Sequence, residues 1–355
     1  MKITVTERVF HFKQPAGTSR GIYTERHSWF VELRDGNRCG VGECAPLPDL
    51  SCDAMPNYGE VLKAKSKVFV FAIEQGSDAL QAFFETLRNY PSMLFGFETA
   101  LMNFERDGNS QSLTTRCCPQ LFNTAFTRGE VGIPINGLVW MGSYEEMLGR
   151  IEDKLEEGFR CVKLKVGAID FLQELDLVKR IRQRFSFHDV ELRLDANGGF
   201  NPDEALYKLE LLSQYAIHSI EQPIKQKQWA FMSALCRDSP LPVALDEELI
   251  GVNDPDAKRQ MLNIIKPSYI VLKPSLHGGM MGCREWIRIA HEEGIGSWIT
   301  SALESNVGLN AIAQFCSDVY GDEITFPQGL GTGRLFTDNV EMGLEVRGDK
   351  LFITS

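Results

Sequence analysis

Six ionisable side chains recur at a nearly constant spacing in the second part of this 355-residue chain. Each stands in, or directly after, a short apolar run, and the intervals from the second lysine onward are 30, 26, 25 and 27 residues. In order they are Lys163, Lys165, Asp195, Glu221, Asp246 and Lys273. Three carboxylates that converge repel one another unless a cation lies among them, and oxygen ligands of this kind suit Mg²⁺. The pattern therefore predicts a Mg²⁺ site formed by Asp195, Glu221 and Asp246, with lysines on both sides.

Each of these residues has a simpler interpretation when it is taken alone. The two lysines of CVKLKVG point to one face of a strand, which is typical of a solvated edge strand. A single Asp after a strand is commonly a helix N-cap, and a Glu before Gln-Pro is commonly a loop charge. The repetition on five successive strands favours a common site over these alternatives.

The lysines indicate acid–base chemistry at this site. A partly desolvated lysine beside a second ammonium group has a lowered pKa, so Lys165 next to Lys163 becomes a usable base near neutral pH. A lysine base beside a divalent metal suits removal of a proton next to a carboxylate, because the enediolate that results needs a cation at its oxygens. Lys163 is then the electrostatic neighbour of Lys165.

From Pro134 onward the chain alternates strand-like and helix-like segments with a period of about 25 to 30 residues. The strand-like segments read INGLVWM, CVKLKVG, VELRLDANGG, IHSIEQPI, LPVALDEEL, YIVLKPSL, GSWITSALES and EITFPQGL. This repetition favours a parallel barrel of the TIM type, although periodicity alone also fits a doubly wound open sheet. The carboxyl ends of barrel strands meet at one rim, which would bring the six charges together.

The first third of the chain has a different pattern. HSWFVELRDGNRCGVGECAPL contains an Asp35-Gly36 turn between two apolar runs and predicts a β-hairpin. Two helical patterns follow, GEVLKAKSKVFVFAIEQ and SMLFGFETALMNFERDG, and Gly108 is a candidate C-cap of the second. We expect an α+β unit of roughly 125 residues, to which a small C-terminal hairpin could return.

Composition excludes several classes of partner. The net charge is −11 without a basic stripe, so neither nucleic acid nor an anionic membrane is an expected partner. The N-terminal residues lack the apolar stretch of a signal peptide and no window is long enough for a membrane span, which predicts a cytoplasmic protein. Nine cysteines without a CxxC pair are expected to be reduced thiols.

The ordered set KLKVG, LDANGGF, EQP, ALDEE and IVLKPSLHGG, followed by SALESNVGLNAIAQF, resembles the enolase superfamily in its muconate lactonizing subgroup. The pairing of a lysine base with Mg²⁺ is itself the known pattern of that superfamily. The resemblance implies a modified TIM barrel, (β/α)7β, over residues 126–337. It also implies an N-terminal α+β capping domain over residues 1–125, with the segment 338–355 returning to the cap.

Three further stretches, GVGECAPLPDLS, LVWMGS and GLGTGRLFTDN, resemble the o-succinylbenzoate synthases, a family of menaquinone-pathway dehydratases. The implied reaction is the syn dehydration of 2-succinyl-6-hydroxy-2,4-cyclohexadiene-1-carboxylate, a small-molecule carboxylate. Lys165 would remove the α-proton and return it to the departing hydroxyl, while Lys273 would stabilise the enediolate from the opposite face, plausibly through a cation–π contact with the ring. Asp195, Glu221 and Asp246 would bind Mg²⁺, for which Mn²⁺ can substitute.

The resemblance also suggests residues around this machinery. Asn197 and Glu247 would support the metal ligands, with an N-cap or surface role as the alternative. Ser301, Glu304 and Gly331 are expected to contact substrate at the same rim. Two segments of the cap, around PAGTSRGIYTERHS and PLPDLS, are expected to close over the barrel mouth, although an ordinary surface loop fits the first composition equally well.

Other functions share these residues. N-succinylamino acid racemases and dipeptide epimerases of the same superfamily use the two lysines as a pair of bases. Dipeptide epimerases typically carry Asp-x-Asp on the final barrel strand, whereas this chain reads TFPQGLGTGRLF there. A barrel that binds a ligand without catalysis would be expected to lack some metal or lysine positions. The oligomeric state stays open, a homo-oligomer included.

Overall fold

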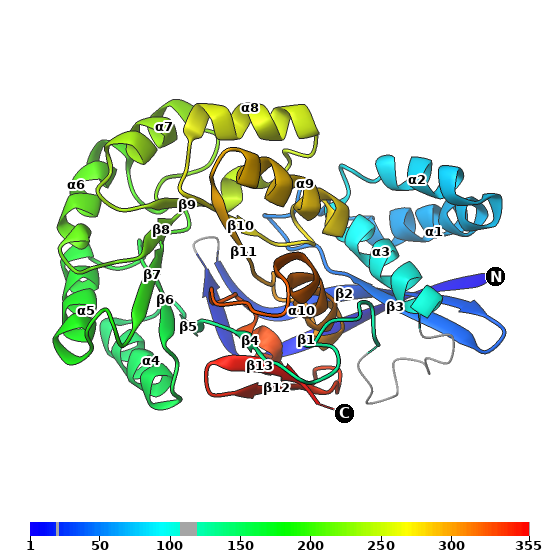
Figure 1. The fold of residues 1–355 in the computed structure, drawn as a ribbon, viewed down its shortest axis with the longest axis horizontal. Coiled ribbons are helices and arrows are strands. Elements are labelled where there is room, and N and C mark those ends of the chain that lie inside the picture. Colours follow the sequence, from blue (N-terminus) through cyan, green and yellow to red (C-terminus); the bar gives the residue numbers. More distant parts are fainter. Residues whose placement is uncertain (19–20, 107–118, 355) are drawn as a thin grey trace.

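The computed structural model describes residues 1–18, 21–106 and 119–354 and contains a capping domain beside a barrel (Figure 1). The candidate C-cap Gly108 and the adjacent Cys117 and Cys118 lie outside the described residues. The other seven cysteines are free thiols, as expected. Within the described ranges, no helix is long and apolar enough to cross a membrane.

The capping domain is a three-stranded antiparallel sheet covered by three helices. The strands are β1 (Lys2–Thr18), β2 (Gly21–Asp35) and β3 (Arg38–Cys44), and the helices are α1 (Tyr58–Gln75), α2 (Ser77–Glu85) and α3 (Pro91–Arg106). The predicted hairpin and both predicted helices are confirmed. Helix α3 packs directly on β3, since a Cβ atom on Gly42 would lie 1.9 Å from the carbonyl oxygen of Gly96. Only glycine permits this close contact.

Seven parallel strands alternate with seven helices along the barrel. The strands, adjacent in this order, are β5 (Gly137–Val139), β6 (Cys161–Lys165), β7 (Glu191–Asp195), β8 (Ser219–Glu221), β9 (Val243–Leu245), β10 (Tyr269–Leu272) and β11 (Gly296–Ile299). The helices are α4 (Tyr144–Glu156), α5 (Phe171–Arg184), α6 (Pro202–Ser213), α7 (Trp229–Asp238), α8 (Pro255–Ile265), α9 (Gly279–Glu292) and α10 (Asn306–Tyr320). Short 3-10 helices η1 (Glu247–Leu249) and η2 (Gly331–Arg334) follow β9 and the final strand segment.

Two residues close the barrel. Gln328 forms a parallel bridge to Ile135, and Gly329 forms one to Thr300 at the end of β11. The amide of Gly329 donates to the carbonyl of Ile299 at 2.8 Å. The sequence predicted a full strand over EITFPQGL, but Pro327 has no N–H to donate and the pairing is limited to the two residues after it. With this segment the barrel has the predicted (β/α)7β arrangement.

Alternation along the strands separates the barrel core from the reactive charges. On β6, Val162 and Leu164 belong to the large apolar cluster that joins the strands to the surrounding helices. Lys163 and Lys165 point to the other face, into the barrel, and both are buried. CVKLKVG is therefore an interior strand and not a solvated edge.

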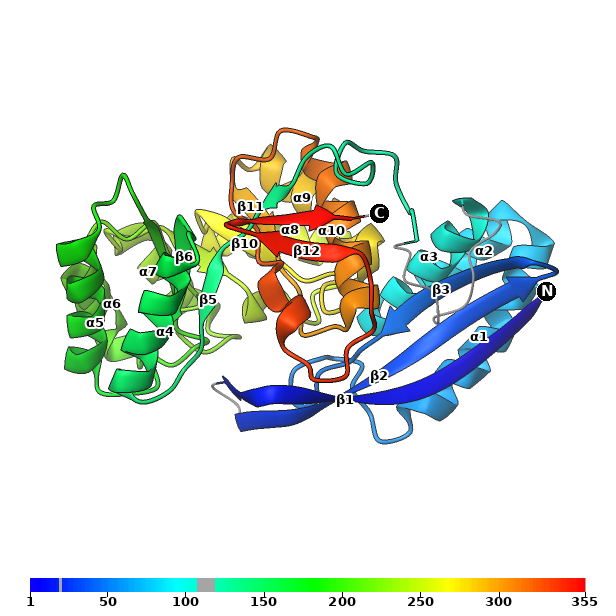
Figure 2. The ribbon, with the colours of Figure 1, turned by 90° about the horizontal axis from the view of Figure 1, so that it is seen from below.

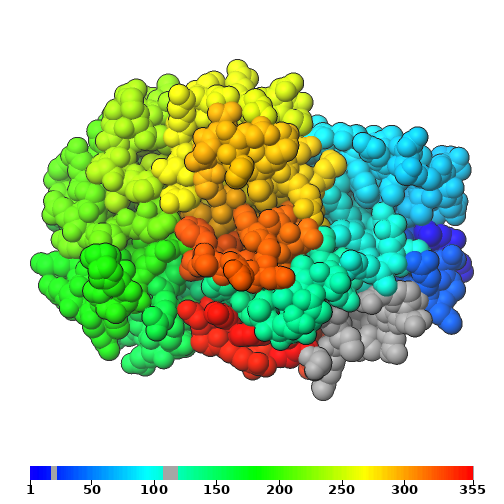
Figure 3. Space-filling view, in the orientation of Figure 1, coloured from blue at the N-terminus to red at the C-terminus, as the bar shows by residue number. Residues whose placement is uncertain are grey.

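The C-terminal hairpin pairs differently from the expectation. Strands β12 (Leu344–Arg347) and β13 (Lys350–Ile353) form a sheet with β4 (Ile133–Pro134), at the entry to the barrel, and not with the cap sheet. Figure 3 shows the hairpin on the surface beside the segment that leads into the barrel. The residues before the hairpin do contact the cap, because Phe336 and Val340 pack with Phe10. Only this connecting stretch returns to the cap.

Two carboxylates of the cap reach the amino ends of barrel helices. Glu43 of β3 is fully buried and accepts hydrogen bonds from the amides of Ser305 (2.9 Å) and Gly308 (2.8 Å) at the start of α10. Glu98 of α3 accepts from the amides of Met280 (2.7 Å) and Met281 (2.9 Å) at the start of α9. The first amides of a helix have no partner within it and attract negative charge. These contacts orient the cap on the barrel.

The Glu98 anchor should make stability depend on pH. Burial raises the pKa of Glu98 to about 7, against the two amide hydrogen bonds, which lower it. Because the folded-state pKa lies above that of the unfolded chain, this group stabilises the fold at low pH, and the contribution is lost as pH rises toward 7. Relative to wild type, Glu98→Gln should gain about 3 kcal/mol in the free energy of unfolding between pH 4 and pH 8. Urea unfolding of the variant and the wild type at pH 4 and pH 8 measures this. The same difference in unfolding free energy between the two proteins at both pH values would contradict it.

Candidate active site at the carboxyl end of the barrel

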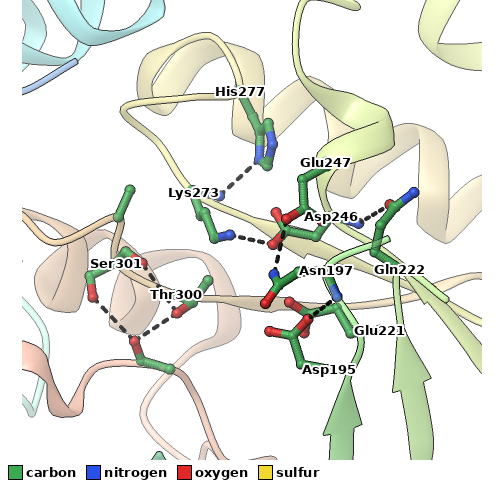
Figure 4. Close-up of polar contacts among 12 residues, drawn as sticks. Asp195, Asn197, Glu221, Gln222, Asp246, Glu247, Lys273, His277, Thr300 and Ser301 are labelled. Atoms are coloured by element: carbon green, nitrogen blue, oxygen red, sulfur yellow. Dashed lines mark hydrogen bonds and ion pairs between the residues drawn. The ribbon is translucent and has the colours of Figure 1, made fainter. Parts of the chain in front are cut away.

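The barrel brings the six predicted residues to one rim. Figure 4 shows Asp195, Glu221, Asp246 and Lys273 there. Lys165, Asp195 and Glu221 are direct neighbours in the sheet register, each at the end of its strand. Asp246 follows the last residue of β9, and Lys273 follows the last residue of β10. One strand–helix unit thus separates each charge from the next, as the spacing predicted.

Ion pairs connect the lysines to the carboxylates. Lys163 Nζ lies 2.7 Å from Glu221 Oε1 and 2.9 Å from Asp195 Oδ2. Lys165 Nζ lies 3.1 Å from Asp195 Oδ2, and Lys273 forms an ion pair with Asp246. The two lysines of β6 are therefore not equivalent, because only Lys163 bridges two carboxylates. All six side chains are buried or nearly so, which strengthens each interaction.

The carboxylates control the charge of these lysines. Burial lowers the pKa of Lys163, but Asp195 and Glu221 outweigh it and hold the pKa well above its ordinary value. Burial also lowers the pKa of Lys273, but nearby carboxylates, chiefly Asp246, outweigh burial and raise it. The sequence argument for a lowered lysine pKa considered only the second ammonium group. For Lys163 and Lys273 the direction is upward, because the nearest charges are negative.

Glu221 differs from the two aspartates. Burial and the neighbouring charge of Asp195 raise the pKa of Glu221 well above its usual range. The pKa of Asp195 is lowered instead, because the ammonium groups of Lys163 and Lys165 outweigh its burial. Crowded carboxylates of this kind would all be ionised more readily with more positive charge among them.

Asn197 and Glu247 lie beside this cluster, as predicted. The Asn197 side-chain oxygen accepts from Lys165 Nζ at 2.6 Å, and its side-chain nitrogen donates to Glu247 Oε1 at 3.0 Å. Asn197 has a φ of +44°, a left-handed conformation that asparagine tolerates better than most residues. Its own amide donates to Asp195 Oδ1 at 3.0 Å. Asn197 therefore links the ends of β6, β7 and η1.

The donor set fits a hard divalent cation. Glu221 Oε2 and Asp246 Oδ1 are buried and have no hydrogen-bond partner among the described residues. Such oxygens are costly to bury unless a cation or donor satisfies them. Within residues 1–18, 21–106 and 119–354, no three acidic, His or Cys side chains are grouped closely enough to hold a metal ion as they stand, and lysines contact the carboxylates. The chemistry of the donors, which are all oxygens, is that preferred by Mg²⁺.

A cavity of about 370 Å³ opens onto the cluster. Its charged wall contains all three lysines together with Asp195, Asn197 and Glu247. The cap contributes Gln14, Tyr23, Leu47 and Leu50, which come from the two segments predicted to close over the mouth. In Figure 2, β1 and β2 extend from the cap toward this side of the barrel. The volume suits a small organic molecule.

Of the three residues predicted to contact substrate, two line the cavity and one does not. Ser301 and Gly331 line the cavity, and the Ser301 hydroxyl lies 2.6 Å from that of Thr332. Glu304 does not line it. The carboxylate of Glu304 is fully buried behind the wall, where it accepts a hydrogen bond from the Ala302 amide at 2.6 Å and one from the Ser275 hydroxyl. The geometry gives Glu304 a supporting contact and not a substrate contact.

Several cavity residues were missed by sequence reasoning. Trp140 follows β5, and Lys165 Nζ lies 5.8 Å from its ring centroid. Its position at a strand end was a usable signal. Leu303, by contrast, has a left-handed φ of +64° that no sequence motif indicated. His277 was also missed: its Nδ1 accepts from the Lys273 amide at 2.9 Å, and burial lowers the pKa of His277 to about 3, so it stays neutral.

Comparisons with known proteins agree with this architecture. Residues 146–338 match the family model described as enolase C-terminal domain-like, which is more than half of the chain, and residues 18–104 match the MenC N-terminal domain. The barrel and its cap therefore have the form of an enolase-type enzyme.

The chain is 43% identical to the o-succinylbenzoate synthase of Desulfotalea psychrophila over 97% of its own length and 96% of that protein. The crystal structure of MenC from Desulfotalea psychrophila LSv54 matches with a TM-score of 0.83 and 39% identity, covering 99% of both chains. A dipeptide epimerase from Enterococcus faecalis V583, solved with Mg and L-Leu-L-Tyr, shares the fold at a TM-score of 0.79 and 17% identity, covering 99% of this chain and 96% of that one. The chain therefore belongs to the enolase superfamily and, within it, to the family of o-succinylbenzoate synthases.

Removing Lys163 should expose the repulsion among the carboxylates. Lys163→Ala leaves Asp195 and Glu221 buried without their shared cation, so the free energy of unfolding in EDTA should fall by about 3 to 5 kcal/mol. Arg180→Ala, which breaks an exposed pair with Asp176, is the control and should cost about 1 kcal/mol or less. Urea unfolding of both variants measures this. An equal effect of the two substitutions would show that Lys163 does not hold the cluster together.

Proposed function

We propose that this protein catalyses the Mg²⁺-dependent syn dehydration of 2-succinyl-6-hydroxy-2,4-cyclohexadiene-1-carboxylate to o-succinylbenzoate, in menaquinone biosynthesis. The observation that carries the proposal is the shared cavity, which Lys165, Lys273 and Asp195 line, with Glu221 and Asp246 at the ends of the next two strands. Membership of the o-succinylbenzoate synthase family supports the substrate, which is a small-molecule carboxylate.

In this proposal Lys165 acts as both base and acid. Its amine removes the proton from the carbon next to the substrate carboxylate, which leaves an enediolate. The ammonium group then gives that proton to the departing hydroxyl, so the carbon–oxygen bond breaks and water leaves. One residue can serve both steps because a syn elimination places the proton and the hydroxyl on one face. The contact with Asn197 at 2.6 Å holds the Lys165 ammonium at the cavity wall.

Lys273 and the carboxylates would stabilise the charge that develops. Lys273 follows the last residue of β10, three strands along the sheet from β7, which carries Asp195. The raised pKa of Lys273 keeps this side chain cationic toward the enediolate. Asp195, Glu221 and Asp246 would hold Mg²⁺, or Mn²⁺ in its place. When bound, the divalent ion supplies positive charge to the oxygens of the substrate carboxylate.

The other functions of the superfamily are less well supported. Dipeptide epimerases typically carry Asp-x-Asp on the final barrel strand to hold the substrate ammonium group, and the segment TFPQGLGTGRLF has no such pair. The Gln328 side chain accepts from the Ile299 amide at 2.8 Å and donates to Phe326 O at 2.7 Å, so it is committed to closing the barrel. N-succinylamino acid racemization remains the second candidate, because both lysines line one cavity and could act as two bases. A cytoplasmic location and a homo-oligomer stay predictions.

The substrate assay tests the proposal directly. The purified protein with Mg²⁺ should convert the cyclohexadiene to the aromatic product, followed by the loss of diene absorbance, and EDTA should stop the conversion. Added Mg²⁺ or Mn²⁺ should restore it. N-succinyl amino acids, followed by polarimetry, form the comparison. Racemization without any dehydration would replace the proposed function with its alternative.

The single-lysine mechanism makes a sharper prediction. Lys165→Ala loses base and acid together, so kcat should fall by roughly 10⁴-fold or more, beyond the range usual for one proton transfer. Lys179→Ala, on the exposed face of α5, is the matched control and should retain full activity. Steady-state kinetics and product analysis compare the two. Substantial turnover by Lys165→Ala would contradict this role.

A further inference from the structure

The turn at residues 302–304 forms part of the cavity wall and has an unusual backbone. Leu303 has a φ of +64°, which residues other than glycine rarely adopt. Its side chain is 7% exposed, packs with Leu47 and Leu276, and lines the cavity. A strained backbone persists only where surrounding contacts hold it. The contacts that hold this turn should therefore matter for the site.

Arg26 of β2 supplies these contacts from the capping domain. Its side chain is 2% exposed, and each of its five N–H bonds points to a backbone carbonyl. The acceptors are Leu303 (3.0 Å), Ala302 (3.4 Å), His27 (3.4 Å), Ala45 and Pro46. The charge is balanced at longer range by the buried carboxylates of Glu43 and Glu304. Because all five N–H groups of Arg26 donate to carbonyl oxygens of the two domains, this side chain forms a fixed joint between the cap and the barrel.

The joint connects two walls of one cavity. On the cap side, Ala45 and Pro46 lead directly into the segment that carries Leu47 and Leu50, both of which line the cavity. On the barrel side, Arg26 holds the carbonyls of Ala302 and Leu303. Arg26 itself is not among the residues that line the cavity.

The barrel holds the same turn from behind. Glu304 accepts from the Ala302 amide at 2.6 Å and from the hydroxyl of Ser275, which stands two residues after Lys273. The turn is thus fixed on one side to the loop of Lys273 and on the other to the cap. Without Arg26 the turn would lose its hydrogen bonds to the cap and keep those from the barrel side, together with the packing of Leu303 on Leu47.

We propose that Arg26 is a positioning residue for the reaction, which sets the apolar wall formed by Leu47, Leu50 and Leu303 without touching the substrate. The cavity then has its full shape only when the cap is docked, because Leu47 and Leu50 of the cap line it and Arg26 holds the turn that carries Leu303. The inference rests on the proposed function for the identity of that substrate.

Kinetics of Arg26→Met test the proposal, with Arg34→Met as the matched control. Arg34 lies on the same strand but is exposed and bonds only to Glu32. We expect Arg26→Met to raise KM about tenfold while kcat falls less than about threefold, because the lysines and carboxylates belong to the barrel. Calorimetric affinity for o-succinylbenzoate should fall by a similar factor. Arg34→Met should behave like wild type in both measurements.

A double-mutant cycle separates positioning from general loss of stability. Leu303→Ala removes the side chain that Arg26 is proposed to place, so it should weaken product binding by itself. Arg26→Met added to Leu303→Ala should then cause a smaller further loss than Arg26→Met causes alone, because part of its effect acts through Leu303 and coupled residues are not additive. Effects that multiply would show that Arg26 acts through something other than this wall, and would overturn the proposal.

Amide hydrogen exchange gives a readout that does not depend on activity. In Arg26→Met, exchange should increase in peptides covering residues 45–51 and 300–304 and stay unchanged in those covering β6 and β7. If Arg26→Met does not fold, Arg26→Lys retains the charge but not the five donors and should show the same pattern more weakly. Unchanged exchange in both segments overturns the inference. If the wild-type protein does not dehydrate the cyclohexadiene substrate, the proposed function is overturned instead. The hydrogen-exchange comparison then still decides the role of Arg26.

Discussion

Charge balance at the mouth of the barrel is the constraint on which the rest of the structure depends. Three carboxylates and three ammonium groups lie together in a region that excludes most water. Unpaired, any one of them would be costly to bury, so the strands that carry them must keep their register. The sheet provides this by placing Lys165, Asp195 and Glu221 side by side. The apolar residues between them anchor each strand to its helix.

The same balance limits what the cluster can do without a further ligand. Each lysine contacts a carboxylate, while Glu221 Oε2 and Asp246 Oδ1 have no hydrogen-bond partner in the part of the chain that the structure describes. A divalent cation bound by these carboxylates would therefore compete with the lysines for the same oxygens. This makes the protonation state of the lysines a property of the whole cluster and not of one residue.

The spacing of ionisable residues was sufficient to predict the barrel and its six charges, because a strand–helix unit has a nearly fixed length. It could not predict which lysine bonds which carboxylate, since that depends on side-chain lengths within the rim. Glu304 shows a second limit: its position along the chain suggested a substrate contact, but the left-handed turn at Leu303 directs the carboxylate behind the wall. Arg26 shows a third limit. Its side chain donates to backbone carbonyl groups, which every residue has, so these contacts leave no pattern in the sequence.

The closing segment of the barrel connects the closure of the sheet to the wall of the cavity. Neighbouring strands from β5 to β11 are joined by ladders of two to five residue pairs, and within the described residues the seam between β5 and β11 is bridged by Gln328 and Gly329. Gly329 also accepts from the Ser301 amide at 3.1 Å, so the seam and the cavity wall share one peptide group. A change at the seam would therefore also reach the cavity wall at Ser301. In a lineage of related sequences, this short joint offers a way to vary substrate size while the catalytic strands stay unchanged.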